Sequence, residues 1–319
     1  MAGGDAAGVR RLIVTADDFG ASRAVNEAVE AAHRGGILTA ASLMVAGDAA
    51  ADAIARARTM PSLGVGLHLV LVEGRPVLPP ERVPALVGGD GAFRTDMAAS
   101  AFRMFLDPAA RRQLHAEVEA QFTAFAATGL ELDHVNAHKH FHLHPTIASA
   151  VLAIGPRFGM RAVRAPVERG HRGIEAFWAR LLARRIRRAG MLVPDQVVGL
   201  AWTGAFDAPR MRAALADLPP GLTEIYTHPA TADRYPGSAA GYRYRDELAA
   251  LTDGLAKAAI LREGMAHGHF ASHHPPPPRP GAAGDLAAQL RGAARARPAG
   301  ADGFARAQAA AVADDAGHA

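Results

Sequence analysis

The sequence predicts an α/β protein in which parallel strands and helices alternate as a (β/α) barrel. Short apolar runs and amphipathic helical patterns follow one another along most of the chain, and polar side chains stand directly after several of the runs. The chain has 319 residues, of which 50% are hydrophobic, so one large core can be built. Repeated strand–helix units favour a barrel over a β-sandwich.

The expected elements alternate in order. Strands are predicted at residues 11–16, 40–46, 64–71, 132–137, 161–164, 196–200, 222–228 and 265–270. Helices are predicted at residues 22–34, 48–59, 109–128, 145–158, 174–189 and 207–217. The segments 73–107 and 166–195 interrupt this alternation, and we interpret them as insertions that shape a pocket over the strand ends.

The first predicted strand delivers two adjacent carboxylates, Asp17 and Asp18, to its C-terminal end. Successive side chains on a strand point in opposite directions, so the pair needs a turn to reach one point, and Gly20 supplies conformational freedom for it. Two adjacent acids can divide metal binding from base catalysis. The alternative is an acidic cap on the helix that begins near Ser22.

Histidines follow two later strands. His68 is the only titratable side chain in the apolar run 64–71, where a satisfied core histidine is the alternative to a ligand. After strand 132–137, four histidines share one parity, so they would project to one side of an extended segment: His138, His140, His142 and His144. Imidazole commonly binds zinc and other divalent ions. A chance cluster on an exposed loop remains the other interpretation.

Strand 222–228 also ends in a histidine, His228. Four strand ends therefore carry acidic or imidazole side chains, both of which can bind metal or transfer protons. In parallel α/β folds, functional side chains gather at the C-terminal ends of the strands. We expect these groups to form one site.

The 174–189 helix is basic and amphipathic. Its apolar residues, Phe177 and Trp178 among them, recur at helical spacing, while arginines occupy the other face. One interpretation is a barrel-covering helix with solvated arginines. The other is a lid or membrane-facing surface, where aromatic rings meet lipid and arginines meet anionic headgroups.

Charge and composition exclude some classes. The formal net charge is +4 and the calculated pI is about 9.9. Nucleic-acid binding would need this charge concentrated and interleaved with aromatic residues, and only the 174–189 segment concentrates it. Cysteine is absent, so a metal must be held by histidine and carboxylate. A non-enzymatic basic protein that binds lipid surfaces remains open.

The chain ends suggest a location. Residues 1–10 leave no room for an apolar signal region and are expected to be flexible. No apolar run approaches the roughly 20 residues of a membrane span. We therefore expect a cytoplasmic protein, with the inner face of the membrane as a further option. Residues 272–319, rich in Pro, Ala, Gly and Arg, predict a disordered tail in which His273 and His274 are solvated.

These motifs together resemble the YdjC-like carbohydrate deacetylases, relatives of the NodB polysaccharide deacetylases, over about residues 11 to 270. The resemblance rests on Ala16-Asp-Asp-Phe-Gly20, Asn26, Gly66-Leu-His68, the histidine run at 138–144 and His228-Pro-Ala230. The longer runs 14–20, 39–45, 66–76 and 136–145 resemble the HpnK-type branch, which is associated with hopanoid biosynthesis. The resemblance implies a distorted (β/α) barrel over residues 11–271, and the branch implies a lipid-linked sugar substrate.

Carried over residue by residue, the family's metal ligands fall on Asp18, His68 and His138, its catalytic base falls on Asp17, and His228 is the remaining polar group at the reacting centre. Substrate contact or support of these groups is expected from Lys139, His140, His142, Arg164 and Trp178. Many family members carry Asp where this chain has Asn136 and His where it has Lys139. The first departure puts in doubt a role for a supporting acid at position 136. The second suggests that Lys139 tunes substrate choice.

The sequence thus predicts a hydrolase that removes acetate from an N-acetylglucosaminyl hopanoid or a related lipid-linked amino sugar, with one divalent ion, zinc or magnesium. Soluble N-acetylated oligosaccharides such as chitobiose are the alternative substrates. Two histidines and a carboxylate also suit ferrous oxygenases and other metal hydrolases, but the adjacent Asp17 favours hydrolysis. Expected partners are the sugar substrate and a membrane surface, without nucleic acid; a homodimer stays open.

Overall fold

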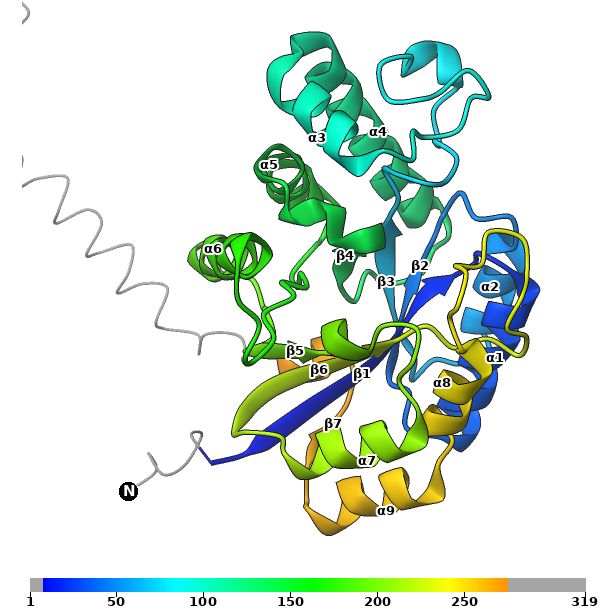
Figure 1. The fold of residues 1–319 in the computed structure, drawn as a ribbon, viewed down its shortest axis with the longest axis vertical. Helices are drawn as coiled ribbons and strands as arrows, with labels where there is room; N and C mark the ends of the chain where they lie inside the picture. Colours follow the sequence, from blue (N-terminus) through cyan, green and yellow to red (C-terminus); the bar gives the residue numbers. More distant parts are fainter. Residues whose placement is uncertain (1–7, 275–319) are drawn as a thin grey trace, which may run out of the picture. The chain divides into compact units, whose positions relative to one another are not determined.

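The computed structural model describes residues 8–274. Of the predicted flexible ends, 1–10 and 272–319, residues 1–7 and 275–319 lie outside the described residues. Seven parallel strands form one curled sheet, and helices surround it (Figure 1). The strands are β1 (Arg10–Phe19), β2 (Ala40–Leu43), β3 (Gly64–Leu69), β4 (Val135–Ala137), β5 (Gln196–Val198), β6 (Gly221–Thr227) and β7 (Ala266–His267).

The sheet is a distorted barrel. Its order is β4-β3-β2-β1-β6-β5, and the short β7 also pairs with β1. Between β4 and β5 the ladder is reduced to isolated bridges, Val135 with Val163 and Ala162 with Leu192. The predicted strand 161–164 is therefore wrong as a full strand, because the chain makes only single bridges there. The fold class itself is confirmed.

Nine α-helices lie in the described part of the chain. They are α1 (Arg23–Gly35), α2 (Ala50–Ala57), α3 (Met97–Leu106), α4 (Pro108–Ala127), α5 (Pro145–Ile154), α6 (Ile174–Arg188), α7 (Ala208–Ala216), α8 (Tyr244–Leu251) and α9 (Gly254–Arg262). The 3₁₀ turns are η1 (Pro80–Arg82), η2 (His138–Leu143), η3 (Gly155–Phe158), η4 (Leu200–Trp202) and η5 (Phe270–His273).

Local signals explain the best-predicted helix. Ser22 is the N-cap of α1, and its hydroxyl accepts a hydrogen bond from the Val25 amide, which satisfies one of the free N–H groups at the helix start. The buried face of α1 then packs against the sheet through Val25, Ala28 and Val29. The strands it covers are buried on both faces, as parallel sheets require.

Both predicted insertions contain helices. Segment 73–107 ends in α3, whose successor α4 starts at once because Asp107 ends one helix and caps the next. Segment 166–195 contains α6, which is amphipathic as predicted. In Figure 1, α3, α5 and α6 lie on one side of the molecule.

An acid at the N-terminal edge of the sheet, Asp133, holds the end of the described chain. The buried Asp133 carboxylate accepts hydrogen bonds from His269 Nδ1 (2.6 Å), the Phe270 amide (3.2 Å) and the Ala271 amide (2.8 Å). His273 is only 8% exposed, and its Nε2 lies 3.4 Å from the Leu12 carbonyl. The expectation that His273 is a solvated tail residue is therefore wrong, because η5 packs it against β1.

Candidate active site

A β-bulge at the end of β1 positions the two adjacent acids. Pairing with β2 runs through Ala16 and resumes only at Phe19, so one extra residue is inserted at Asp17–Asp18. Asp18 itself has φ of 62°, in the left-handed region. The bulge, and not Gly20 alone, turns Asp18 toward the groups around it.

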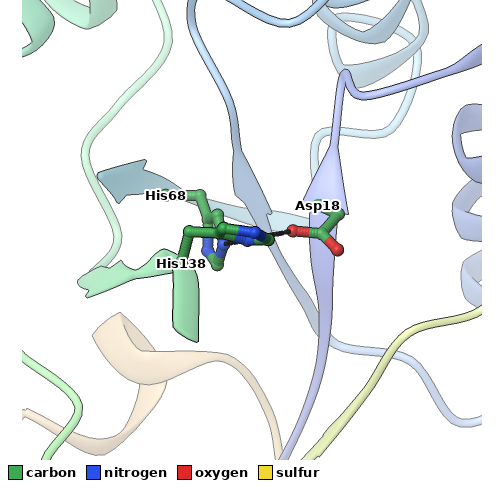
Figure 2. A group of neighbouring side chains, drawn as sticks. All are labelled: Asp18, His68 and His138. Atoms are coloured by element: carbon green, nitrogen blue, oxygen red, sulfur yellow. Dashed lines mark hydrogen bonds and ion pairs between the residues drawn. The ribbon is translucent and has the colours of Figure 1, made fainter. Parts of the chain in front are cut away.

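Asp18, His68 and His138 converge at the strand ends. The Asp18 Oδ1 atom lies 3.2 Å from His68 Nε2 and 3.2 Å from His138 Nδ1, and the two nitrogens lie 3.4 Å apart. Figure 2 shows both imidazoles directed at the carboxylate. Among the described residues, this is the group of His and acidic side chains whose ligand atoms could hold a metal ion.

The surroundings of His68 fit a metal ligand. Its Nδ1 lies 2.7 Å from Asn136 Oδ1, an acceptor, so this ring nitrogen carries the proton. The opposite nitrogen, Nε2, then presents a lone pair to the Asp18 carboxylate. Two acceptors so close together need a proton or a cation between them. The donor set of two imidazoles and one carboxylate suits a divalent ion.

Asp17 lies beside this group without belonging to it. Its carboxylate is 2% exposed and forms a two-pronged ion pair with Arg164, at 2.5 and 3.0 Å. It also accepts hydrogen bonds from Ser42 Oγ (2.8 Å) and Asn136 Nδ2 (2.9 Å). Burial would raise the pKa of Asp17, but the charge and the hydrogen bonds of Arg164 hold that pKa well below its ordinary value.

Arg164 is fully buried between two acids. Besides Asp17, it binds Glu224, whose Oε1 lies 2.7 Å from its Nη2, and its guanidinium lies 4.7 Å from the centre of the Tyr226 ring. Burial disfavours the charged guanidinium, but the two carboxylates raise the pKa of Arg164 above its ordinary value. Arg164 therefore orients Asp17 from behind and is not among the residues that line the cavity described below.

The histidine run is not extended. From His138 the chain enters η2, in which Lys139 (φ 52°) and His140 (φ 53°) are left-handed. The parity argument is therefore wrong, because the turn sends the four rings to different places. His138 joins Asp18 and His68; His142 is buried with Nε2 2.8 Å from the Arg164 carbonyl; His144 lies against Phe105.

A cavity of about 310 Å³ opens over the group that could hold a metal ion. Its walls include Asp17, His228 and the predicted residues Lys139 and His140. It does not include His142 or Trp178, so α6 contributes no side chain to this wall. Of the five residues predicted to contact substrate or support the site, two therefore reach the cavity and three do not, and Arg164 among the three supports Asp17.

The same cavity is also lined by residues that sequence reasoning missed, among them Glu73, Leu200, Thr203, Tyr226 and Tyr242. The Tyr226 hydroxyl lies 2.9 Å from Thr203 Oγ1 and 3.2 Å from His140 Nε2, and burial raises its pKa well above the ordinary value, so it stays protonated. The sequence contained one signal for Tyr226: it lies two residues before His228 at the end of β6, so both side chains are expected to point to the same face.

Backbone strain is concentrated at this cavity. In the part of the chain that the structure describes, four non-glycine residues have positive φ, and all four line the cavity: Asp18, Glu73, Lys139 and His140. Each such conformation costs of order 1–3 kcal/mol and persists only where surrounding contacts enforce it. Such strained residues cluster at functional sites, so this observation supports the cavity as the candidate active site.

Comparison with known proteins agrees with the geometry. A family model described as "YdjC-like protein" matches residues 11–262. A carbohydrate deacetylase of Geobacillus stearothermophilus is 30% identical over 259 residues, which cover 80% of this chain and 95% of the relative. A human carbohydrate deacetylase is 34% identical, with 71% of this chain and 75% of the relative covered.

Other matches are shorter or concern the fold alone. A carbohydrate deacetylase of Brevibacillus brevis is 40% identical, but the match covers 46% of this chain and 56% of the relative. A crystal structure of a putative cellobiose-phosphate cleavage protein from Enterococcus faecalis superposes with a TM-score of 0.70. It covers 84% of this chain and 100% of that chain, at 24% identity.

Proposed function

Because the chain belongs to the YdjC-like protein family, we propose that it is a carbohydrate deacetylase, a hydrolase that splits the acetamide of an N-acetylated amino sugar into amine and acetate. One observation carries the proposal. Three ligand atoms converge at the strand ends, beside a carboxylate, Asp17, that binds none of them and is fixed by Arg164. Ion binding and proton acceptance are therefore assigned to different side chains: Asp18, His68 and His138 could hold an ion, and Asp17 could act as the base.

The proposed roles follow from the contacts. A divalent ion, zinc or magnesium, on Asp18, His68 and His138 would polarise the acetamide carbonyl and lower the pKa of a water molecule. Asp17 then accepts the proton as that water adds to the carbonyl carbon. Its low pKa makes Asp17 a weak base, which would suit a water molecule whose own pKa a bound ion lowers. Arg164 keeps the carboxylate ionised and oriented.

His228 is proposed to act on the leaving side. It lines the same cavity, and Glu247 fixes its backbone by accepting a hydrogen bond from the His228 amide at 2.5 Å. As the carbon–nitrogen bond breaks, a protonated His228 would give its proton to the departing amine, and acetate would leave with the oxygen of the water. The products are a free amino sugar and acetate.

We further propose that the sugar is attached to a lipid, as on an N-acetylglucosaminyl hopanoid, and that the protein contacts the inner face of the membrane. Large apolar side chains, 54–68% exposed, lie on α3 and α6: Phe102, Phe105, Leu106, Ile174 and Phe177. We call them the apolar surface. Helix α6 also carries arginines, which suits anionic headgroups. No helix of residues 8–274 is long and apolar enough to cross a bilayer.

The test is acetate release, with mass spectrometry of the sugar. Purified protein receives N-acetylglucosaminyl hopanoid and chitobiose side by side, each with and without a chelator. Chelator-sensitive loss of the acetyl group from the hopanoid supports both parts of the proposal. Reaction with chitobiose alone keeps the deacetylase and removes the lipid substrate. No acetate from either substrate, with metal bound, contradicts the deacetylase.

A further inference from the structure

Aromatic side chains gather around the candidate active site. The chain has four tyrosines. Three of them, Tyr226, Tyr242 and Tyr244, line the cavity, and the fourth, Tyr235, packs against Tyr244 with ring centres 5.1 Å apart. Ligand sites combine such aromatic walls with a few convergent polar groups. The question is which ring is free to meet a ligand.

Two of these tyrosines are used inside the protein. The Tyr226 hydroxyl bonds Thr203 and His140, and the Tyr244 hydroxyl accepts a hydrogen bond from the Ala239 amide at 2.7 Å. Tyr242 differs, because its hydroxyl bonds no residue in the described range 8–274 and its side chain is half-buried. Its polar end is therefore available to a ligand.

The ring of Tyr242 is nevertheless fixed. It lies against Gly204, where a Cβ would come within 2.4 Å of the ring, so only glycine allows this approach. Its centre is 5.7 Å from that of His228 and 5.4 Å from that of Tyr244. A rigid ring beside the proposed proton donor can hold a flat apolar face of a ligand at little cost in side-chain entropy.

A charged pair lies on another wall of the cavity. Lys139 and Glu73 form an ion pair, with side chains 43% and 35% exposed, and both residues have left-handed backbones. Surface ion pairs add little to stability, so stability does not account for two strained residues there. The pair offers both donors and an acceptor at the cavity wall, as a ring of hydroxyl groups requires.

We propose that Tyr242 and the Glu73–Lys139 pair are the sugar-recognition residues: the Tyr242 ring stacks on one face of a single terminal amino-sugar ring, and the ion pair hydrogen-bonds its hydroxyls. The inference rests on the proposed function and adds the size of the ligand. A cavity of about 310 Å³ is at the small end of ligand sites, about right for one sugar ring. The remainder of the substrate stays outside.

The first experiment measures KM and kcat for chitobiose with Tyr242→Ala and Tyr242→Phe. Loss of the ring should raise KM about three- to tenfold, the range of one aromatic contact, with kcat changed less. Tyr242→Phe should fall between the wild type and Tyr242→Ala. Leu261→Ala, a large exposed apolar side chain outside the cavity, is the control and should leave both constants unchanged.

The second experiment replaces the charged pair. Glu73→Gln and Lys139→Met should each raise KM, and the double variant should raise it by less than the product of the single effects, because the two residues act together. Glu119→Gln removes the acid of another exposed pair, with Arg157, and should change nothing. Unchanged KM in Tyr242→Ala or in both pair variants overturns the assignment.

A binding measurement separates this inference from the proposed reaction. Saturation-transfer NMR follows N-acetylglucosamine on chelator-treated protein, where no turnover occurs. Binding that weakens in Tyr242→Ala supports the recognition residues even if the wild type with metal releases no acetate. Deacetylation with binding equal in wild type and Tyr242→Ala keeps the enzyme and overturns the recognition residues. The circular dichroism of each variant must match that of the wild type.

Discussion

Single residues at the candidate site combine predictable chemistry with unpredictable geometry. The position of Asp17, Asp18, His68 and His138 after strands was readable, because parallel strands end at one edge of a sheet. The left-handed backbones of Lys139 and Glu73 were not, since contacts far along the chain hold them there. Arg164 looked like a strand residue near the substrate, yet it is buried behind Asp17.

The role of Asp17 can be tested directly. Asp17→Asn keeps the shape of the side chain but cannot accept the proton, so turnover should fall by about 10²-fold or more. Bound metal, measured by elemental analysis, should be unchanged because Asp17 holds no ligand atom of the group. Full turnover with metal bound would refute the base assignment. Asp18→Asn is the contrast, in which metal itself should be lost.

Asn136 is expected to support metal binding without touching the metal. Its side chain links His68 Nδ1 to Asp17 Oδ1, which keeps the His68 proton away from the ligand nitrogen. Asn136→Ala should therefore weaken metal affinity about 10- to 100-fold. A competition titration with a chelating dye measures this. Asn136→Asp, which retains an acceptor for His68, should bind metal more tightly than Asn136→Ala; equal affinities would contradict the explanation.

Whole elements followed their local signals where those signals were strong. The six helices α1, α2, α4, α5, α6 and α7 were predicted from their helical spacing, whereas α3, α8 and α9 were missed. Helix α8 has no side-chain cap and so no clear beginning in the sequence. Helix α9 is capped by Asp253, but its first residue is Gly254, a poor helix former. The bridges made by Ala162 and Val163 depend on Leu192 and Val135, which lie elsewhere in the same chain, so they have no signature in the local sequence.

Helices α3 and α6 should carry the contact with lipid. Phe105→Ser with Phe177→Ser removes two exposed rings of the apolar surface without opening a cavity in the core. We expect weaker cosedimentation with vesicles of phosphatidylglycerol and phosphatidylcholine, while kcat on chitobiose is unchanged. Leu255→Ser, also exposed but on α9, is the matched control. Equal vesicle binding by all three proteins would remove the membrane contact.

For the molecule as a whole, the Asp133–His269 pair should make stability depend on pH. The hydrogen bond to Asp133 raises the pKa of His269 above its ordinary value of 6.5, against a smaller opposing effect of burial. A group whose pKa is higher in the folded state than in the unfolded state contributes its full stabilisation below the unfolded-state pKa. This contribution is lost as the pH rises through the folded-state pKa. The wild type should therefore exceed His269→Gln in stability at pH 6 by more than at pH 9.

Urea unfolding at both pH values measures this difference. His115→Gln, at an exposed position of α4, is the control. Its difference from the wild type in free energy of unfolding should be the same at pH 6 and pH 9. A constant difference between wild type and His269→Gln at pH 6 and pH 9 would contradict the charge-based stabilisation. Because Asp133 and His269 line a different cavity from the candidate active site, KM for the folded variant should not move.

The central place of β1 in the sheet has a consequence for biosynthesis. The strand that leaves the ribosome first pairs with β6, more than 200 residues later, through the register Arg10–Gly221 to Ala16–Thr227, and with β7 after that. Until those segments emerge, β1 and the acids at its end have only β2 as a partner. Truncated nascent chains that stop before β6 should therefore be protease-sensitive at β1, and chaperones would meet an apolar strand that is paired on one side only during most of translation.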